Sequence, residues 1–78
     1  VKMKQLLEFL IQSVVNYPQE VSIEEKIQGE VVSLAIKANP EDIKVIIGRN
    51  GRTIKAIRNL LWVVAAKQGK KINLAIQE

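Results

Sequence analysis

Apolar residues recur along this chain with two different periods, and each period predicts one kind of element. Over Lys2 to Tyr17 they lie three or four positions apart, the spacing of an amphipathic helix. This apolar stripe consists of Met3, Leu6, Leu7, Leu10, Ile11, Val14 and Val15. Phe9 lies on the opposite side, and Pro18 ends the predicted helix because the residue before a proline is kept out of the helical conformation.

Three other segments alternate at every second residue, which is the period of a β-strand. The first two, Val21–Gln28 and Val31–Lys37, are separated by so short a turn at Gly29 that they are predicted to form an antiparallel hairpin. The third segment is Lys71–Gln77. The apolar residues that share one face of these strands are Val21, Ile23, Ile27, Val32, Leu34, Ile36, Ile72, Leu74 and Ile76.

A short second helix is predicted to begin at Asn39-Pro40-Glu41-Asp42. Asparagine caps helices well, proline suits the first helical position, and acidic residues favour the positive end of the helix dipole. The helix is expected to turn Ile43, Ile46 and Ile47 inward and to end at Gly48.

A longer helix is predicted from Arg52 to about Lys67. Its expected core stripe consists of Ile54, Ile57, Leu60, Leu61 and Val64. Trp62 and Val63 lie off this stripe. Two interpretations remain open for Trp62: the first helix covers it, or it belongs to a surface that a partner covers.

The predicted order is helix, strand, strand, helix, helix, strand, an α+β arrangement in a single domain of residues 1–78. Because two helices connect the second and third strands, these strands are expected to be parallel, so the three-stranded sheet is mixed. All three helices then cover one face. The opposite face is expected to stay in water, because its residues are polar or small: Val31, Ser33, Ala35, Lys37, Lys71, Asn73, Ala75 and Gln77.

The composition argues against several classes of function. Without cysteine or histidine the chain lacks disulfides, zinc sites of the Cys/His type, thiol nucleophiles and the commonest general base. The neighbouring carboxylates at positions 24/25 and 41/42 do not supply a nucleophile with a base, so we expect no enzyme, cofactor or metal. The longest apolar run, residues 60–66, is too short to cross a membrane, and the lack of cysteine fits a cytoplasmic protein.

The charges are segregated along the chain. Residues 1–43 hold four basic and seven acidic residues, whereas residues 44–77 hold eight basic residues and no acidic one. Such a basic half points to a polyanionic partner, most often a nucleic acid. The alternative is a solvated cationic face that the acidic first half balances in space.

The string from Val45 to Lys55 places Gly48-Arg49-Asn50-Gly51 between the two predicted helices. Glycines allow a sharp turn and expose the backbone amides. The free N–H groups and positive dipole of the following helix point into the same space, which suits a phosphate. The loop lacks the Gly-Lys-Ser/Thr ending of nucleotide hydrolases and the third glycine of dinucleotide-binding folds.

In this context the chain resembles a KH domain, whose GxxG loop between two helices clamps about four nucleotides of single-stranded nucleic acid. Over its whole length the order of elements is similar to the type II KH fold. The Asn-Tyr-Pro-Gln-Glu-Val and Pro-Glu-Asp segments resemble the KhpA family of small bacterial single-KH proteins. This resemblance implies an RNA chaperone or post-transcriptional regulator that self-associates or pairs with a KhpB-like protein.

The resemblance also implies roles for residues around the loop. Gly48 and Gly51 frame it, Arg49 and Asn50 are its variable positions, and Ile47 is the candidate to touch a base. Of the neighbouring apolar residues, Ile46 and Ile54 are expected in the core. The expected RNA-binding residues are Lys44, Ile47, Gly48, Arg49, Asn50, Gly51, Arg52 and Lys55.

Two hypotheses follow: a non-catalytic module for single-stranded RNA, or a protein–protein adaptor with little RNA affinity of its own. The three aromatic residues, Phe9, Tyr17 and Trp62, all lie away from the loop, so phosphate contacts should dominate and the affinity should be weak. Two joined copies of a weakly binding domain bind more tightly than one, because the second contact becomes intramolecular. We therefore expect a homodimer, or a heterodimer with a KhpB-like protein, with Trp62 as a candidate contact.

Overall fold

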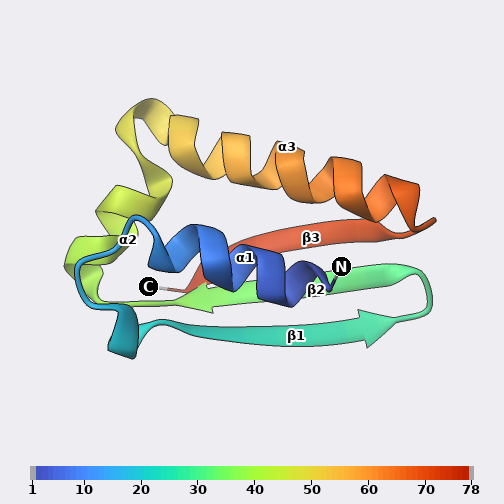
Figure 1. Ribbon diagram of the computed structural model, residues 1–78, viewed down its shortest axis with the longest axis horizontal. Helices are drawn as coiled ribbons and strands as arrows, with labels where there is room; N and C mark the ends of the chain where they lie inside the picture. Colours follow the sequence, from blue (N-terminus) through green and yellow to red (C-terminus); the bar gives the residue numbers. More distant parts are fainter. Residues whose placement is uncertain (1, 78) are drawn as a thin grey trace.

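The computed structural model describes residues 2–77, and its elements follow the predicted order (Figure 1). The three helices are α1 (Met3–Gln12), α2 (Pro40–Ile47) and α3 (Arg52–Lys67), and the three strands are β1 (Ser22–Gln28), β2 (Val31–Lys37) and β3 (Lys71–Gln77). Two short 3₁₀ helices, η1 (Pro18–Glu20) and η2 (Arg49–Gly51), lie in the connections.

The strands form one mixed sheet in the order β1-β2-β3, as predicted. β1 and β2 pair antiparallel, with Ser22 opposite Lys37 and Gln28 opposite Val31, because the turn between them leaves no room for a crossover. β2 and β3 pair parallel, with Val31 beside Lys71, because α2 and α3 carry the chain back to the other end of the sheet. This is the α+β architecture of the type II KH fold.

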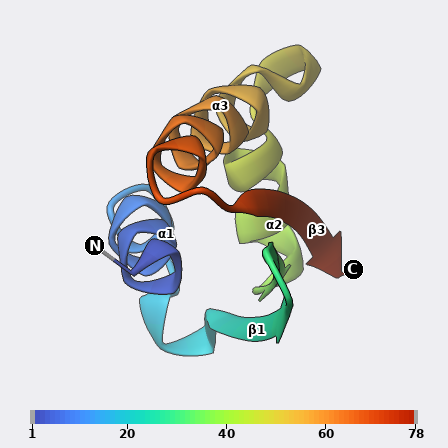
Figure 2. The same ribbon diagram turned by 90° about the vertical axis from the view of Figure 1, so that its right-hand side faces the viewer.

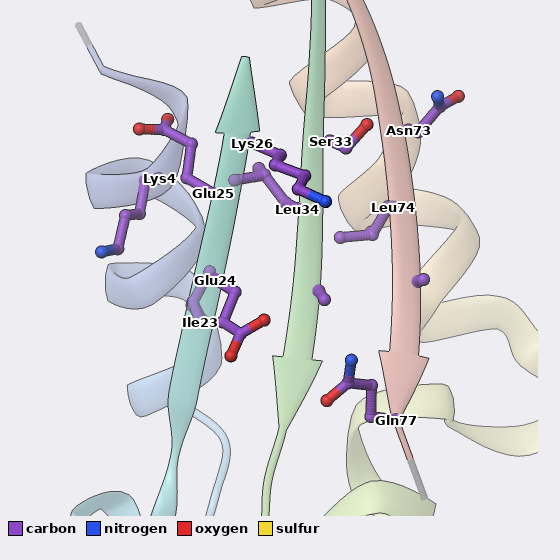
Figure 3. Close-up of a pocket in the computed structure, with 12 residues that line it drawn as sticks. Lys4, Ile23, Glu24, Glu25, Lys26, Ser33, Leu34, Asn73, Leu74 and Gln77 are labelled. Atoms are coloured by element: carbon purple, nitrogen blue, oxygen red, sulfur yellow. The ribbon is translucent and has the colours of Figure 1, made fainter. Parts of the chain in front are cut away.

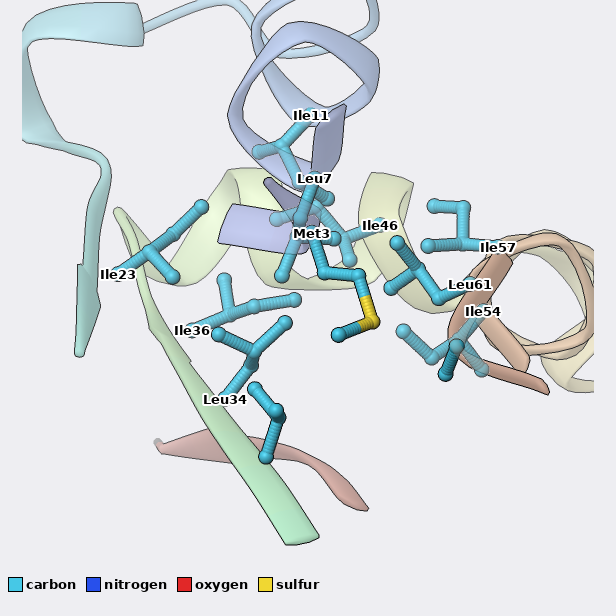
Figure 4. Close-up of a cluster of buried hydrophobic side chains, with 12 residues drawn as sticks. Met3, Leu7, Ile11, Ile23, Leu34, Ile36, Ile46, Ile54, Ile57 and Leu61 are labelled. Atoms are coloured by element: carbon cyan, nitrogen blue, oxygen red, sulfur yellow. The ribbon is translucent and has the colours of Figure 1, made fainter. Parts of the chain in front are cut away.

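The helices lie on one side of the sheet (Figures 1 and 2). α1 and α3 run next to each other over this face, and α2 packs against α3 near the point where β2 ends. Figure 4 shows side chains of α1, β2, α2 and α3 converging between these layers. The fully buried apolar side chains are Leu7, Ile11, Val32, Leu34, Ile36, Ile46, Leu61 and Ala65.

The first helix is shorter than predicted, since α1 ends at Gln12 and not at Tyr17. The hydroxyl of Ser13 and its backbone amide both donate to the carbonyl oxygen of Phe9, at 2.7 and 3.2 Å, at the end of the helix. Farther along, the backbone amides of Asn16 and Tyr17 donate to the carboxylate of Asp42, both at 2.9 Å. These bonds to a distant residue replace the helical bonds that the periodicity predicted.

The apolar stripe of α3 also differs from the prediction. Leu60, expected in the core, is 45% exposed, whereas Ala65, which was not expected there, is fully buried. The core follows positions 57, 61 and 65, one residue every four, so position 60 lies on the flank of the helix. The interpretation in which α1 covers Trp62 is wrong, because this side chain is 61% exposed.

Candidate nucleic-acid interface

The backbone leaves α2 at Gly48. Its amide still donates to the carbonyl oxygen of Lys44 at 2.9 Å, but its φ of 76° and ψ of 177° break the helix. A β-carbon at this position would overlap with the side chain of Thr53 and lie 2.9 Å from the backbone nitrogen of Thr53. Position 48 therefore requires glycine both for its positive φ and for its close approach to the start of α3.

The next three residues complete the loop as η2. The amide of Gly51 donates to the carbonyl oxygen of Gly48 at 3.2 Å, which closes a tight turn. Asn50 has a φ of 57° and Gly51 a φ of 74°, both left-handed, a conformation that asparagine tolerates better than most residues. Arg49 and Asn50 are exposed. The loop therefore presents one cationic and one amide side chain to solvent.

The first turn of α3 opens directly onto this loop. Gly51 is the N-cap residue, and no side chain of residues 2–77 caps the helix there. The first turn contains no acidic residue, and Arg52 and Lys55 are exposed. The positive end of a 16-residue helix and two formal cations thus adjoin the loop, an arrangement that favours an anion.

An apolar hollow of about 310 Å³ lies beside the loop, along α2. It is lined by Ala38, Pro40, Ile43, Lys44 and Ile47. The sequence predicted Lys44 and Ile47 for the site but missed the other three. A signal was available: positions 40, 43 and 47 are three and four residues apart and so share one side of α2. The hollow offers an apolar surface next to the cationic loop.

The three isoleucines around the loop differ in burial. Ile46 is fully buried and Ile54 is 8% exposed, so both belong to the core. Ile47 is half-buried and lines the hollow. The structure therefore brings together Lys44, Ile47, Gly48, Arg49, Asn50, Gly51, Arg52 and Lys55 at one end of α2 and α3.

The basic half of the sequence does not form one continuous site. Lys44, Arg49, Arg52 and Lys55 lie around the junction of α2 and α3. Residues 67, 70 and 71 lie at the opposite end of α3 and at the start of β3 (Figure 1). Only the first group adjoins the loop, so the net charge of the second half overstates the charge at the candidate site.

A second hollow, of about 720 Å³, lies over the open face of the sheet. Figure 3 shows Glu24, Lys26, Ser33, Asn73 and Gln77 along this face. This face carries both acidic and basic side chains, and small residues form its centre, as predicted for a face in water. It therefore lacks the concentration of positive charge found at the loop.

Among residues 2–77, no group of three or more acidic residues is placed to hold a metal ion. No helix within the same range is long and apolar enough to cross a membrane.

The chain is similar to known proteins over nearly its whole length. Residues 4–76 match the family model described as the KH domain of KhpA/KhpB. A protein of Clostridium perfringens named RNA-binding protein KhpA is 38% identical over 95% of this chain and 99% of its own length. Proteins of the same name from Clostridium acetobutylicum and Chlamydia caviae are 39% and 41% identical, over 95% and 97% of this chain and 99% and 97% of their own lengths.

Proposed function

This chain belongs to the KhpA/KhpB family of KH domains, and we propose that it binds single-stranded RNA without catalysing a reaction. The relatives that match it over nearly their whole lengths carry the name RNA-binding protein KhpA, which supports RNA as the partner. We further propose that residues 1–78 act as a single KH domain.

The RNA backbone is proposed to lie across the loop Gly48–Gly51. The observation that carries this proposal is the loop geometry: Gly48 and Gly51 turn the chain so sharply that Arg49 and Asn50 project beside the uncapped start of α3. A phosphate at this position would face backbone amides, the positive end of α3 and the cations of Arg49, Arg52 and Lys55. Phosphate contacts hold the strand but carry no sequence information.

A base of the same strand is proposed to enter the apolar hollow next to the loop. Ile43 and Ile47 would contact its face, and Lys44 lies at the rim of the hollow, where a phosphate or a base oxygen comes within reach. Apolar contact of this kind accepts several bases, so the sequence preference is expected to be loose. Weak binding with loose preference suits a cytoplasmic RNA chaperone or post-transcriptional regulator.

The outward side of α3 supports a second part of the proposal, association with another protein. Leu60 and Val63 are 45% and 47% exposed and lie one turn apart. Contiguous exposed apolar surface marks contacts between proteins. We propose that this pair forms the centre of a contact with a second copy of the chain or with a KhpB-like protein. Trp62, exposed on the same helix, is not part of this pair.

The salt dependence of RNA binding tests the proposed function. If roughly three phosphates are neutralised, the logarithm of the affinity for a single-stranded RNA should fall with the logarithm of salt with a slope near −2. Electrophoretic mobility at several salt concentrations measures this slope. No binding even at low salt would favour the alternative, an adaptor that uses the KH fold for protein contacts alone.

A further inference from the structure

Trp62 is the only tryptophan of the chain, and its side chain is 61% exposed on α3. Tryptophan is enriched at binding surfaces, where its large ring supplies much contact area. The position of Trp62 around the helix axis indicates what kind of partner the ring binds.

An α-helix turns by about 100° per residue. Trp62 therefore lies within about 40° of Lys55 and Arg58 around the axis of α3, and both of these cations are exposed. Leu60 and Val63 are farther away, at about 160° and 100° from Trp62. The indole thus lies on the basic side of α3 and is separated from the exposed apolar pair.

The basic side of α3, formed by Lys55, Arg58 and Trp62, begins at the loop. Lys55 is in the first turn of the helix, and Trp62 lies about 16 Å farther along the axis than Gly51, at about 1.5 Å per residue. No acidic residue occurs between positions 44 and 77. A strand held at the loop by its phosphates can therefore pass Lys55 and Arg58 and reach the indole without meeting a negative side chain of this helix.

We propose that Trp62 is a stacking platform for a base of single-stranded RNA, beyond the nucleotides that the loop holds. The inference rests on the proposed function of the loop and extends the site along α3. The lysine beside the ring favours RNA over a protein partner, because lysine is depleted at protein interfaces. Stacking on an aromatic ring accepts every base, so this contact adds affinity without adding sequence preference.

The experiment uses the fluorescence of Trp62 itself, with selective excitation of the indole. Oligouridylates of about 4 and about 12 nucleotides are the probes, because a KH loop clamps about four nucleotides. The longer RNA should quench the indole, and Trp62→Ala should weaken its binding about 5- to 150-fold, as measured by mobility shift. The shorter RNA should bind the parent and Trp62→Ala equally. Phe9→Ala, which removes a similarly exposed aromatic ring (69%) from α1, is the matched control and should bind both RNAs as the parent does.

Three results would overturn the inference. The first is equal binding of the longer RNA by the parent and Trp62→Ala. The second is binding of that RNA without any change in indole fluorescence. The third is a lower solution mass of Trp62→Ala than of the parent in sedimentation, which would place the ring in a protein contact. A parent that binds neither RNA would instead refute the proposed function, and the stacking platform with it.

Discussion

The carboxylate of Asp42 accepts a hydrogen bond from the backbone amide of Tyr17, with 2.9 Å between Oδ2 and N, across 25 residues of sequence. The other carboxylate oxygen accepts from the amide of Asn16 at the same distance. Asp42 lies in the first turn of α2 and is fully buried. The Asp42 side chain thereby attaches the segment after α1 to α2, the helix that leads into the loop.

Replacing Asp42 should destabilise the fold. Asparagine keeps one acceptor oxygen but turns an N–H group toward the second backbone donor, so Asp42→Asn should lower the free energy of unfolding by about 2 kcal/mol. Urea unfolding measures this as a lower midpoint with an unchanged slope. Glu41→Gln is the matched control: Glu41 is the exposed neighbour in the same helical turn and should lose no more than about 1 kcal/mol. Equal midpoints for the two variants would show that the bonds from Asn16 and Tyr17 contribute nothing measurable.

The two loop glycines should differ in their tolerance of a side chain. Alanine at Gly51 meets no atom within 4 Å and suffers only from its left-handed backbone, at about 1–2 kcal/mol. Alanine at Gly48 adds a collision with Thr53, so the loss should rise to about 2–4 kcal/mol. Adding Thr53→Ala to Gly48→Ala should restore only part of the stability, because the backbone nitrogen of Thr53 remains 2.9 Å from the added carbon. Equal losses for Gly48→Ala and Gly51→Ala in urea unfolding would contradict the close packing at Gly48.

The position of a cation, and not only its charge, should decide its effect on RNA binding. Lys55→Gln removes a charge next to the loop and should reduce the magnitude of the salt slope by about 0.7, the value expected for one phosphate contact with a single strand. Lys71→Gln removes the same charge from the far end of the molecule and should leave the slope unchanged. Mobility shifts at several salt concentrations make the comparison. Equal slopes for both variants would mean that the basic half acts through its net charge alone.

Association through α3 should be sensitive to charge at Val63. A lysine there places a charge beside Leu60 in the proposed contact, so Val63→Lys should sediment at a lower mass than the parent while remaining folded. Val14→Lys is the control, because Val14 has a similar exposed fraction, 42% against 47%, and does not lie on α3. If both variants retain the mass of the parent, the exposed pair on α3 is not a protein contact.

Most of the fold could be predicted because each element carries its own local signal. The alternation over Val31–Lys37 and the cap at Asn39 depend on neighbouring residues only; the Asn39 side chain does accept from the amide of Glu41, at 2.9 Å. The end of α1 could not be predicted in this way. It depends on Asp42, whose acidic character was interpreted as a favourable helix start, while its bonds to Asn16 and Tyr17 form only once the chain has folded.

The burial of residues on the flanks of α3 could not be predicted from local signals either. Leu60 and Leu61 lie about 100° apart around the axis of α3, on the two borders of the expected apolar stripe. Only the packed neighbours decide that position 61 is buried and position 60 exposed. Small residues weaken the signal further: Ala65 is fully buried, although its short side chain adds little to an apolar pattern. At the candidate site, the glycines and cations are visible in the sequence, and the spacing of Pro40, Ile43 and Ile47 indicates one side of the hollow. Ala38 carries no such signal, because it lies before α2 and lines the hollow only in the folded chain.

The most direct test of the loop as the RNA site is the double variant Arg49→Asp/Asn50→Asp. Both side chains are exposed, Asp is tolerated in the left-handed region, and acids near the start of α3 are favourable, so the fold should persist. The local charge changes by three units, from one cation to two carboxylates where a phosphate must approach. Lys71→Asp/Asn73→Asp makes the same charge change at exposed positions of β3 and is the matched control.

The decisive measurement is the affinity of these two variants and the parent for one single-stranded RNA at one low salt concentration, with thermal unfolding of each recorded alongside. The loop variant should unfold like the parent and lose RNA binding at least tenfold, while the β3 variant should keep most of its affinity. A folded loop variant that binds RNA as tightly as the parent would show that Gly48–Gly51 is only a structural turn.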